Sequence, residues 1–215
     1  MPKQNRVTPY GEIIATSARG TLMGNRGILH DGQQQIVRPY QHKAWIFCLL
    51  EFKGRRRAVM SPGKYTELFF LDEATALAAG HRPCFECQRE KAESFRNAWR
   101  AANSELVGDG RLKAGQIDAV LHAERLTPAR RIKDRRKRTY PAPLAELPDG
   151  TFVAGDGAPY LVWGERLYPW TAVGYLTPGQ RPPDMQVVVL TPHSIVQALA
   201  GGYRPMVHPS AGTEP

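Results

Sequence analysis

Cys84 and Cys87 are the residues whose type and spacing point most directly to a chemistry. Two thiolates separated by two residues can bind one ion, and this spacing forms half of many tetrahedral zinc sites. A complete site needs two further ligands, and the chain offers only Cys48 and six histidines. No second pair with ligand spacing accompanies them. The sequence therefore predicts half of a zinc site and leaves open whether zinc is bound.

The segment around these cysteines has a characteristic order of elements. The apolar run Phe69-Phe70-Leu71 is followed by Asp72 at a helix N-cap position, and Gly80-His81-Arg82-Pro83 then leads into Cys84. Residues 65–90 resemble the second half of the Ada-type metal-binding domain of bacterial alkylation-repair regulators. The resemblance covers about an eighth of the chain. It implies a zinc-binding, DNA-contacting module in which Cys84 and Cys87 take the places of the last two thiolate ligands.

The upstream ligands of that family are missing from this sequence. The family has another pair of ligands, one of which accepts a methyl group from DNA phosphotriesters. Residues 53–64 contain no cysteine, and Ser61-Pro62-Gly63-Lys64 lies near the expected ligand position. Cys48 is the only upstream thiol, and its strand is apolar on both faces. We therefore expect Cys48 to be a buried free cysteine and do not extend the resemblance to methyl transfer.

Positive charge is concentrated in two segments. Residues 1–60 and residues 111–140 each carry a net charge of +7, whereas residues 61–110 and 141–215 carry −2 and −3. Such a distribution favours a polyanionic partner, DNA or RNA, although solvated loops without this role are the alternative. The residues expected to contact phosphates are Arg55, Arg56, Arg57, Arg130, Arg131, Lys133, Arg135, Arg136, Lys137 and Arg138.

The hydrophobic pattern predicts an α+β fold of antiparallel sheets and short helices, with the Ada-like strand, helix and cysteines at its centre. Residues 1–140 are expected to form a β-rich part that contains this module (65–102) and a basic helical arm (111–140). Residues 141–215 are expected to form a smaller part, rich in proline, glycine and aromatic residues, that packs on the first as one compact body.

Individual elements can also be predicted. Helices are expected over residues 90–102, 112–125 and from about 191 to 201, and a mobile arm is expected over residues 128–138. Residues 45–52 and 58–60 are expected to form a hairpin with a basic tip. The run of strand, helix and Gly80-His81-Arg82-Pro83 has an echo before Gly202-Tyr203-Arg204-Pro205, which indicates either a duplication or a helix stop used twice.

His30, His42 and His81 are the weak candidates for catalysis. A histidine base near phosphate-binding residues would suit phosphodiester cleavage, but no second histidine or carboxylate has spacing that enforces a site. Walker, G-x-G-x-x-G and G-x-S-x-G motifs are absent from the sequence. The leading hypothesis is a nucleic-acid-binding protein of a DNA-repair or regulatory kind. The alternatives are a metal- or histidine-dependent enzyme acting on nucleic acid, and a protein-interaction module with packed cysteines.

Cysteine usage and apolar runs indicate the compartment. Three cysteines do not make an extracellular disulfide framework, and no signal-like apolar run follows the first residues. The longest apolar run, residues 44–50, is far shorter than the roughly 18 residues of a membrane helix. We expect a cytoplasmic protein without a membrane partner.

Overall fold

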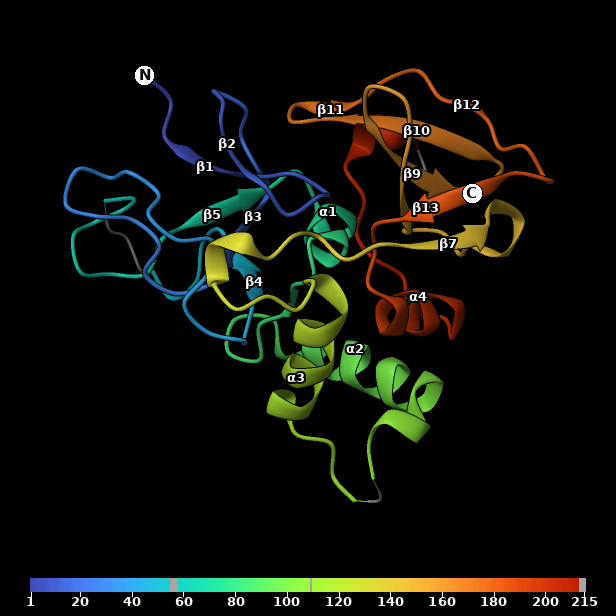
Figure 1. Cartoon of the computed structure of the whole chain (residues 1–215), viewed down its shortest axis with the longest axis horizontal. Helices are drawn as coiled ribbons and strands as arrows, with labels where there is room; N and C mark the ends of the chain where they lie inside the picture. The colour runs from blue at the N-terminus through green and yellow to red at the C-terminus, as the bar shows by residue number, and fades with distance from the viewer. Residues whose placement is uncertain (55–57, 109, 213–215) are drawn as a thin grey trace.

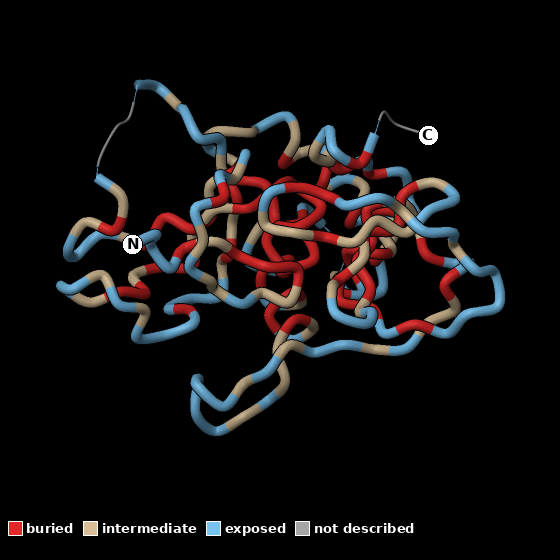
Figure 2. The backbone as a smooth tube through the Cα atoms, turned by 90° about the horizontal axis from the view of Figure 1, so that it is seen from above, coloured by how far each residue is buried: buried red, intermediate tan, exposed pale blue. Residues whose placement is uncertain are grey.

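The structure describes residues 1–54, 58–108 and 110–212. These residues contain two β-sheets and four α-helices, joined by turns and loops. In this computed structural model the fold is α+β, with two sheets rich in antiparallel pairs, as the sequence predicts. Figure 1 shows the two sheets on either side of α1, with α2, α3 and α4 gathered below them. Figure 2 shows buried segments in the middle of the molecule and exposed loops at its periphery.

The first sheet has the strand order β2-β1-β5-β3-β4-β6. The β1–β5 and β4–β6 pairs are parallel, and the other pairs are antiparallel. One face of the sheet packs into the core and the other is half-buried, because side chains alternate along each strand. Its strands are β1 (Gln4–Val7), β2 (Ile13–Ala15), β3 (Leu22–Asn25), β4 (Ile46–Leu49), β5 (Leu68–Phe70) and β6 (Arg82–Pro83).

Strand β3 contains a glycine, Gly24, in its middle. Gly24 weakens the strand signal, but its missing side chain is needed, because a Cβ there would lie 2.3 Å from a ring carbon of Phe70. The predicted hairpin of residues 45–52 with residues 58–60 is wrong. Strand β4 pairs with β3 and β6 instead, and residues 58–60 form no strand.

The second sheet is antiparallel throughout, with the order β11-β10-β9-β8-β13-β7 and with β12 paired to β10. Its strands come from the last third of the chain, where aromatic and β-branched residues are frequent. They are β7 (Tyr140–Pro143), β8 (Phe152–Ala154), β9 (Pro159–Trp163), β10 (Arg166–Thr171), β11 (Gly174–Tyr175), β12 (Gly179–Gln180) and β13 (Gln186–Val189).

The helices are α1 (Glu73–Ala78), α2 (Arg89–Ala102), α3 (Ala114–Arg125) and α4 (His193–Ala200). Short 3-10 turns occur at Ser104–Leu106, Ile132–Asp134, Leu144–Glu146 and Pro209–Ala211. Helix α2 buries Ala92, Phe95 and Trp99 on one face, in agreement with the spacing of its apolar residues. None of the helices in the described ranges has the length and apolar character needed to cross a bilayer.

Helix α1 is the central element of the fold, and all six of its residues are buried. The Asp72 carboxylate caps the helix by accepting from the Thr75 backbone N–H at 2.8 Å, and it also accepts from the Tyr175 hydroxyl at 2.6 Å. The Glu73 carboxylate accepts from the Met206 N–H at 2.9 Å. The first turn of α1 therefore ties the C-terminal segment to the middle of the chain.

The two predicted copies of the helix stop have the same backbone geometry. Gly80 and Gly202 both adopt the left-handed conformation, with φ of 84° and 98°. In each copy the residue after the glycine donates its N–H to the carbonyl five residues earlier, from His81 to Ala76 and from Tyr203 to Ala198. Both are Schellman caps, in which glycine is favoured because it has no Cβ.

Candidate metal centre

Parallel pairing of β4 with β6 brings Cys48 next to the Cys84-x-x-Cys87 segment. Ile46 pairs with Arg82 and Phe47 with Pro83, so the next residues in register are Cys48 and Cys84. The Cys84 N–H donates to the Phe47 carbonyl at 2.9 Å, which fixes this register at the end of β6. A distant strand thus supplies a third thiol, although the three cysteines form no sequence motif together.

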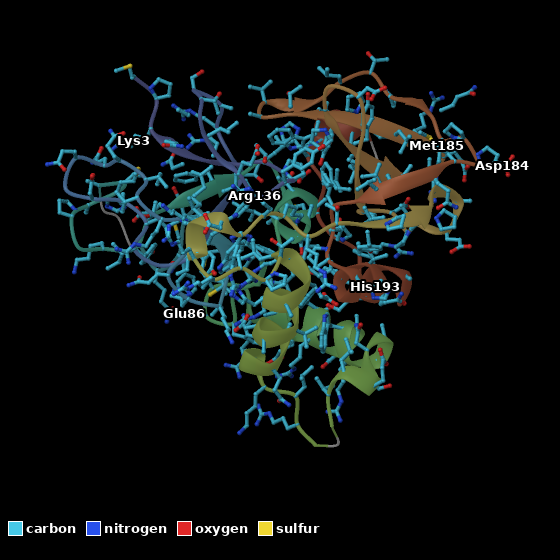
Figure 3. All side chains as sticks on the ribbon, in the orientation of Figure 1. Lys3, Glu86, Arg136, Asp184, Met185 and His193 are labelled. Carbon is cyan, nitrogen blue, oxygen red and sulfur yellow. The ribbon has the colours of Figure 1, made fainter. Side chains whose placement is uncertain are left out.

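Cys87 joins the other two through a tight turn before α2. The Gln88 N–H donates to the Cys84 carbonyl at 3.1 Å, and the Glu86 N–H donates to the Cys84 Sγ at 3.4 Å. Glu86, labelled in Figure 3, lies in this turn and is exposed. Backbone N–H groups that point at sulfur stabilise its thiolate form, which is the form that binds metals.

The three sulfur atoms lie within 4.8 Å of one another, and all three cysteines are free. Three thiolates bound to one tetrahedral zinc ion, each at about 2.3 Å, would be separated by about 3.8 Å. Cys48, Cys84 and Cys87 therefore lie together at spacings that suit a metal ion with modest rearrangement. No histidine, aspartate or glutamate of the described residues joins this group.

Proton sharing within the cluster favours ionisation of one thiol. A hydrogen bond from Cys48, assisted by backbone N–H groups, lowers the pKa of Cys84 to about 5. The same interaction with Cys84, together with burial, raises the pKa of Cys48, and burial raises the pKa of Cys87. The first proton to leave the metal-free cluster therefore comes from Cys84.

All three cysteines line a cavity of about 1050 Å³ on the half-buried face of the first sheet. Its walls include apolar side chains from three neighbouring strands, among them Met23, Ile46 and Phe69. The cavity gives the cysteine cluster access to molecules from solution.

The expectation that Cys48 is a buried free cysteine is wrong in one respect, since Cys48 is free but only half-buried. Phe47 is the buried residue of β4, whereas Cys48 is half-buried on the opposite face, with Ile46. The apolar run around Cys48 hid the alternation, since both faces of the strand carry apolar residues. Only the pairing partner of β4 could have revealed the third cysteine of the cluster, and that partner follows about 35 residues later along the chain.

The three histidines considered for catalysis are held in separate environments. His30 is buried, with Nδ1 at 2.6 Å from the Thr66 hydroxyl and Nε2 at 3.2 Å from the Ser61 carbonyl. His42 is exposed on a loop. His81 is fully buried, and burial lowers its pKa well below the usual value, first by desolvation and then through Arg26. The structure therefore does not assemble these side chains into one site.

The segment 126–138, which we call the basic strap, is anchored at its end. Leu126 and Lys137 form a bridge, and the Arg138 N–H donates to the Arg125 carbonyl at 3.1 Å. Figure 1 shows this yellow segment passing beside α1 between α3 and β7. The prediction of a mobile arm is therefore wrong for the end of the segment, because backbone pairing and the half-buried Lys137 hold it in place.

The basic side chains of the strap fall into two groups. Arg130, Arg131, Lys133, Arg136 and Arg138 are exposed, and Figure 3 labels Arg136. The Lys137 ammonium instead donates to the Ala78 carbonyl at the end of α1, and Nη1 of Arg135 lies 3.2 Å from Nε2 of His122. Arg55, Arg56 and Arg57 lie outside the described residues.

Buried cations around Trp45 are a feature that the sequence did not suggest. The guanidinium groups of Arg26 and Arg125 lie 4.0 and 3.8 Å from the Trp45 ring centroid. Arg125 also donates to the Gly80 carbonyl at 2.8 Å, and Arg26 donates from Nε to the His81 ring at 3.1 Å. Cation–π contacts with Trp45 and hydrogen bonds to an imidazole and a backbone carbonyl thus hold the two buried guanidinium groups.

Lys137 should make the free energy of unfolding rise with pH between about pH 7 and pH 10. Burial, followed by repulsion from Arg26 and Arg125, lowers the pKa of Lys137 to about 7. Because the unfolded lysine keeps its proton up to a pKa of about 10.4, the unfolded chain binds more protons between these values, and stability rises with pH there. We expect the free energy of unfolding to rise from pH 7 to pH 9 by about 2 kcal/mol more in the parent protein than in Lys137→Met.

Urea unfolding at both pH values checks this expectation. Lys133→Met, at an exposed position of the same strap, serves as the control and should keep the pH dependence of the parent protein. Equal pH dependence in the parent protein and Lys137→Met would contradict the assignment.

Comparisons with known proteins do not assign the chain to a family. A scan against protein-family models and searches of curated proteins and of solved structures returned no match. The likeness of residues 65–90 to the Ada-type domain therefore stays a prediction from the sequence, and the function has to be argued from the geometry above.

Proposed function

We propose that this protein is a zinc-binding protein whose metal is held by Cys48, Cys84 and Cys87. The observation that carries the proposal is the convergence of three sulfur atoms from two segments within 4.8 Å. Thiolates favour zinc over magnesium or calcium, which prefer oxygen ligands. The ion would link β4 to the turn before α2 and so stabilise this edge of the first sheet.

Elemental analysis of the purified protein tests the zinc site. After loading with zinc and desalting, the parent protein should retain about one ion per chain, and each of Cys48→Ser, Cys84→Ser and Cys87→Ser should retain far less. His42→Asn is the control, because His42 is an exposed potential ligand outside the cluster. Zinc retained by all three serine variants, or by none of the proteins, would overturn the proposal.

We further propose that the zinc protein binds nucleic acid through the basic strap. The supporting observation is that Lys137 and Arg138 anchor the strap while Arg130, Arg131 and Lys133 remain exposed. An anchored segment loses less conformational entropy on binding than a mobile one, so each phosphate contact contributes more to affinity. The resemblance of residues 65–90 to a DNA-contacting module is consistent with this role.

Salt dependence of binding tests the strap. Changing Arg130, Arg131 and Lys133 to alanine together should weaken binding to fluorescent duplex DNA and reduce the slope of log K against log salt by about 0.9 for each phosphate that is no longer neutralised. A matched variant that removes three exposed cations elsewhere, Arg89, Arg100 and Arg166, should keep the slope of the parent protein. Equal slopes in the two triple variants would remove the strap from the interface.

A further inference from the structure

The cysteine cluster supplies three ligands, whereas zinc takes four in nearly all protein sites. No histidine, aspartate or glutamate of residues 1–54, 58–108 and 110–212 has a donor atom close enough to join the three sulfur atoms. Closed structural sites have four protein ligands, and sites with three keep a position for water or another molecule. The ligand count therefore indicates an open site.

The surroundings of the cluster allow a molecule to reach that position. Cys48, Cys84 and Cys87 all line the cavity of about 1050 Å³. This volume is close to the upper end of the range of small-molecule sites, about 300 to 1,000 Å³. The adjoining wall is the half-buried face of the first sheet, with Met23 on β3 and Phe69 on β5. This apolar part of the wall favours a ligand with an apolar body, and Asn25, Glu51 and Glu86 line other parts of the cavity.

The ligand set determines which donor atom is favoured. Three thiolates carry one more negative charge than the ion neutralises, so the centre polarises water less than a site of neutral histidines does. A sulfur donor matches the soft character of the site, and a thiol loses its proton when it binds zinc. A thiol therefore suits the fourth position better than a hydrolytic water.

From these observations we propose that the cavity binds a small organic thiol with an apolar body, whose sulfur completes the coordination of the metal. The S–H bond breaks, a bond from sulfur to the metal forms, and the proton passes to solvent. No electron transfer is involved. This inference rests on the proposed zinc site and adds the chemical class of its ligand.

Cobalt-substituted protein provides the test, since cobalt(II) reports bound thiolates by charge-transfer absorption. The protein would be titrated with 2-phenylethanethiol, and with 2-phenylethanol as its oxygen analogue, under argon with a phosphine as reductant. We expect the thiol to increase the sulfur-to-cobalt absorption and to release about one proton per site, and the alcohol to do neither.

Two variants locate the binding site. Ile46→Ala shortens a cavity wall on the face that carries Cys48, and it should weaken thiol binding about fivefold while cobalt stays bound. Arg166→Ala, at an exposed position on β10, should bind the thiol as the parent protein does. Equal affinities in both variants would overturn the cavity as the thiol site.

The outcomes separate this inference from the proposed function. Failure of the protein to bind cobalt through its cysteines would overturn both proposals. A cobalt spectrum typical of three thiolates that the thiol leaves unchanged would overturn only the thiol ligand and leave the metal site standing. Release of cobalt on adding the thiol, or an equal response to the alcohol, would also overturn it.

Discussion

Replacing Asp72 with alanine is expected to lower the free energy of unfolding by about 4 kcal/mol. The carboxylate is buried and accepts four hydrogen bonds. Oδ1 accepts from the Thr75 N–H and hydroxyl at 2.8 and 2.7 Å, and Oδ2 accepts from the Tyr175 hydroxyl at 2.6 Å and the His208 N–H at 2.9 Å. Alanine would remove the helix cap and leave buried donors without an acceptor. Urea unfolding of both proteins measures the loss.

Asparagine at the same position separates the loss of the helix cap from the loss of the acceptor for the C-terminal segment. Asp72→Asn keeps the oxygen that caps α1 but places an N–H₂ group opposite the His208 N–H, so we expect a loss between those of the parent protein and Asp72→Ala. A loss below about 1 kcal/mol in Asp72→Ala would contradict the central role of this carboxylate, since a surface substitution has effects of that size.

Replacing Asp118 with alanine is expected to cost about 3 to 5 kcal/mol. Asp118 on α3 forms two hydrogen bonds of 2.8 Å with Arg82, and the two side chains are only 8% and 7% exposed. The variant would leave the Arg82 guanidinium buried without its partner. Because Arg82 lies two residues before Cys84, this pair also fixes β6 against α3.

A double variant distinguishes an unpaired charge from a packing defect. Arg82→Met with Asp118→Leu removes both charges, and it should recover most of the stability lost in Asp118→Ala. Glu93→Ala is the matched control, because Glu93 pairs with Arg89 at 3.2 Å on the exposed face of α2, and it should change stability by less than about 0.5 kcal/mol. Equal losses in Asp118→Ala and Glu93→Ala would contradict a buried ion pair that stabilises the fold.

The parts of the fold that sequence reasoning predicted are those set by local chemistry. Asp72 caps α1, Gly80 stops it in the left-handed conformation, and the helix predicted over residues 90–102 is α2, Arg89–Ala102. Each signal depends on neighbours within about one helical turn. The same reasoning found the second helix stop at Gly202, and both stops have the same hydrogen-bond pattern.

The parts it missed depend on contacts between distant segments. Position 24 on β3 needs glycine because the Phe70 ring occupies the space beside it, and Arg26 is buried because the Trp45 ring and the Gly11 carbonyl receive its charge. Half of the candidate metal site, Cys84 and Cys87, was visible as a motif. Cys48 was not, because its role follows from the parallel register of β4 with β6, which no local pattern specifies.

X-ray absorption at the zinc edge of the zinc-loaded protein tests the three-cysteine centre most directly. In the absence of added thiol, we expect a shell of three sulfur atoms at about 2.3 Å and one lighter atom. Cys48→Ser should reduce the sulfur count to two, if the variant retains enough metal for the measurement. A shell of nitrogen and oxygen without sulfur, or a sulfur count that is unchanged in Cys48→Ser, would contradict the three-cysteine centre.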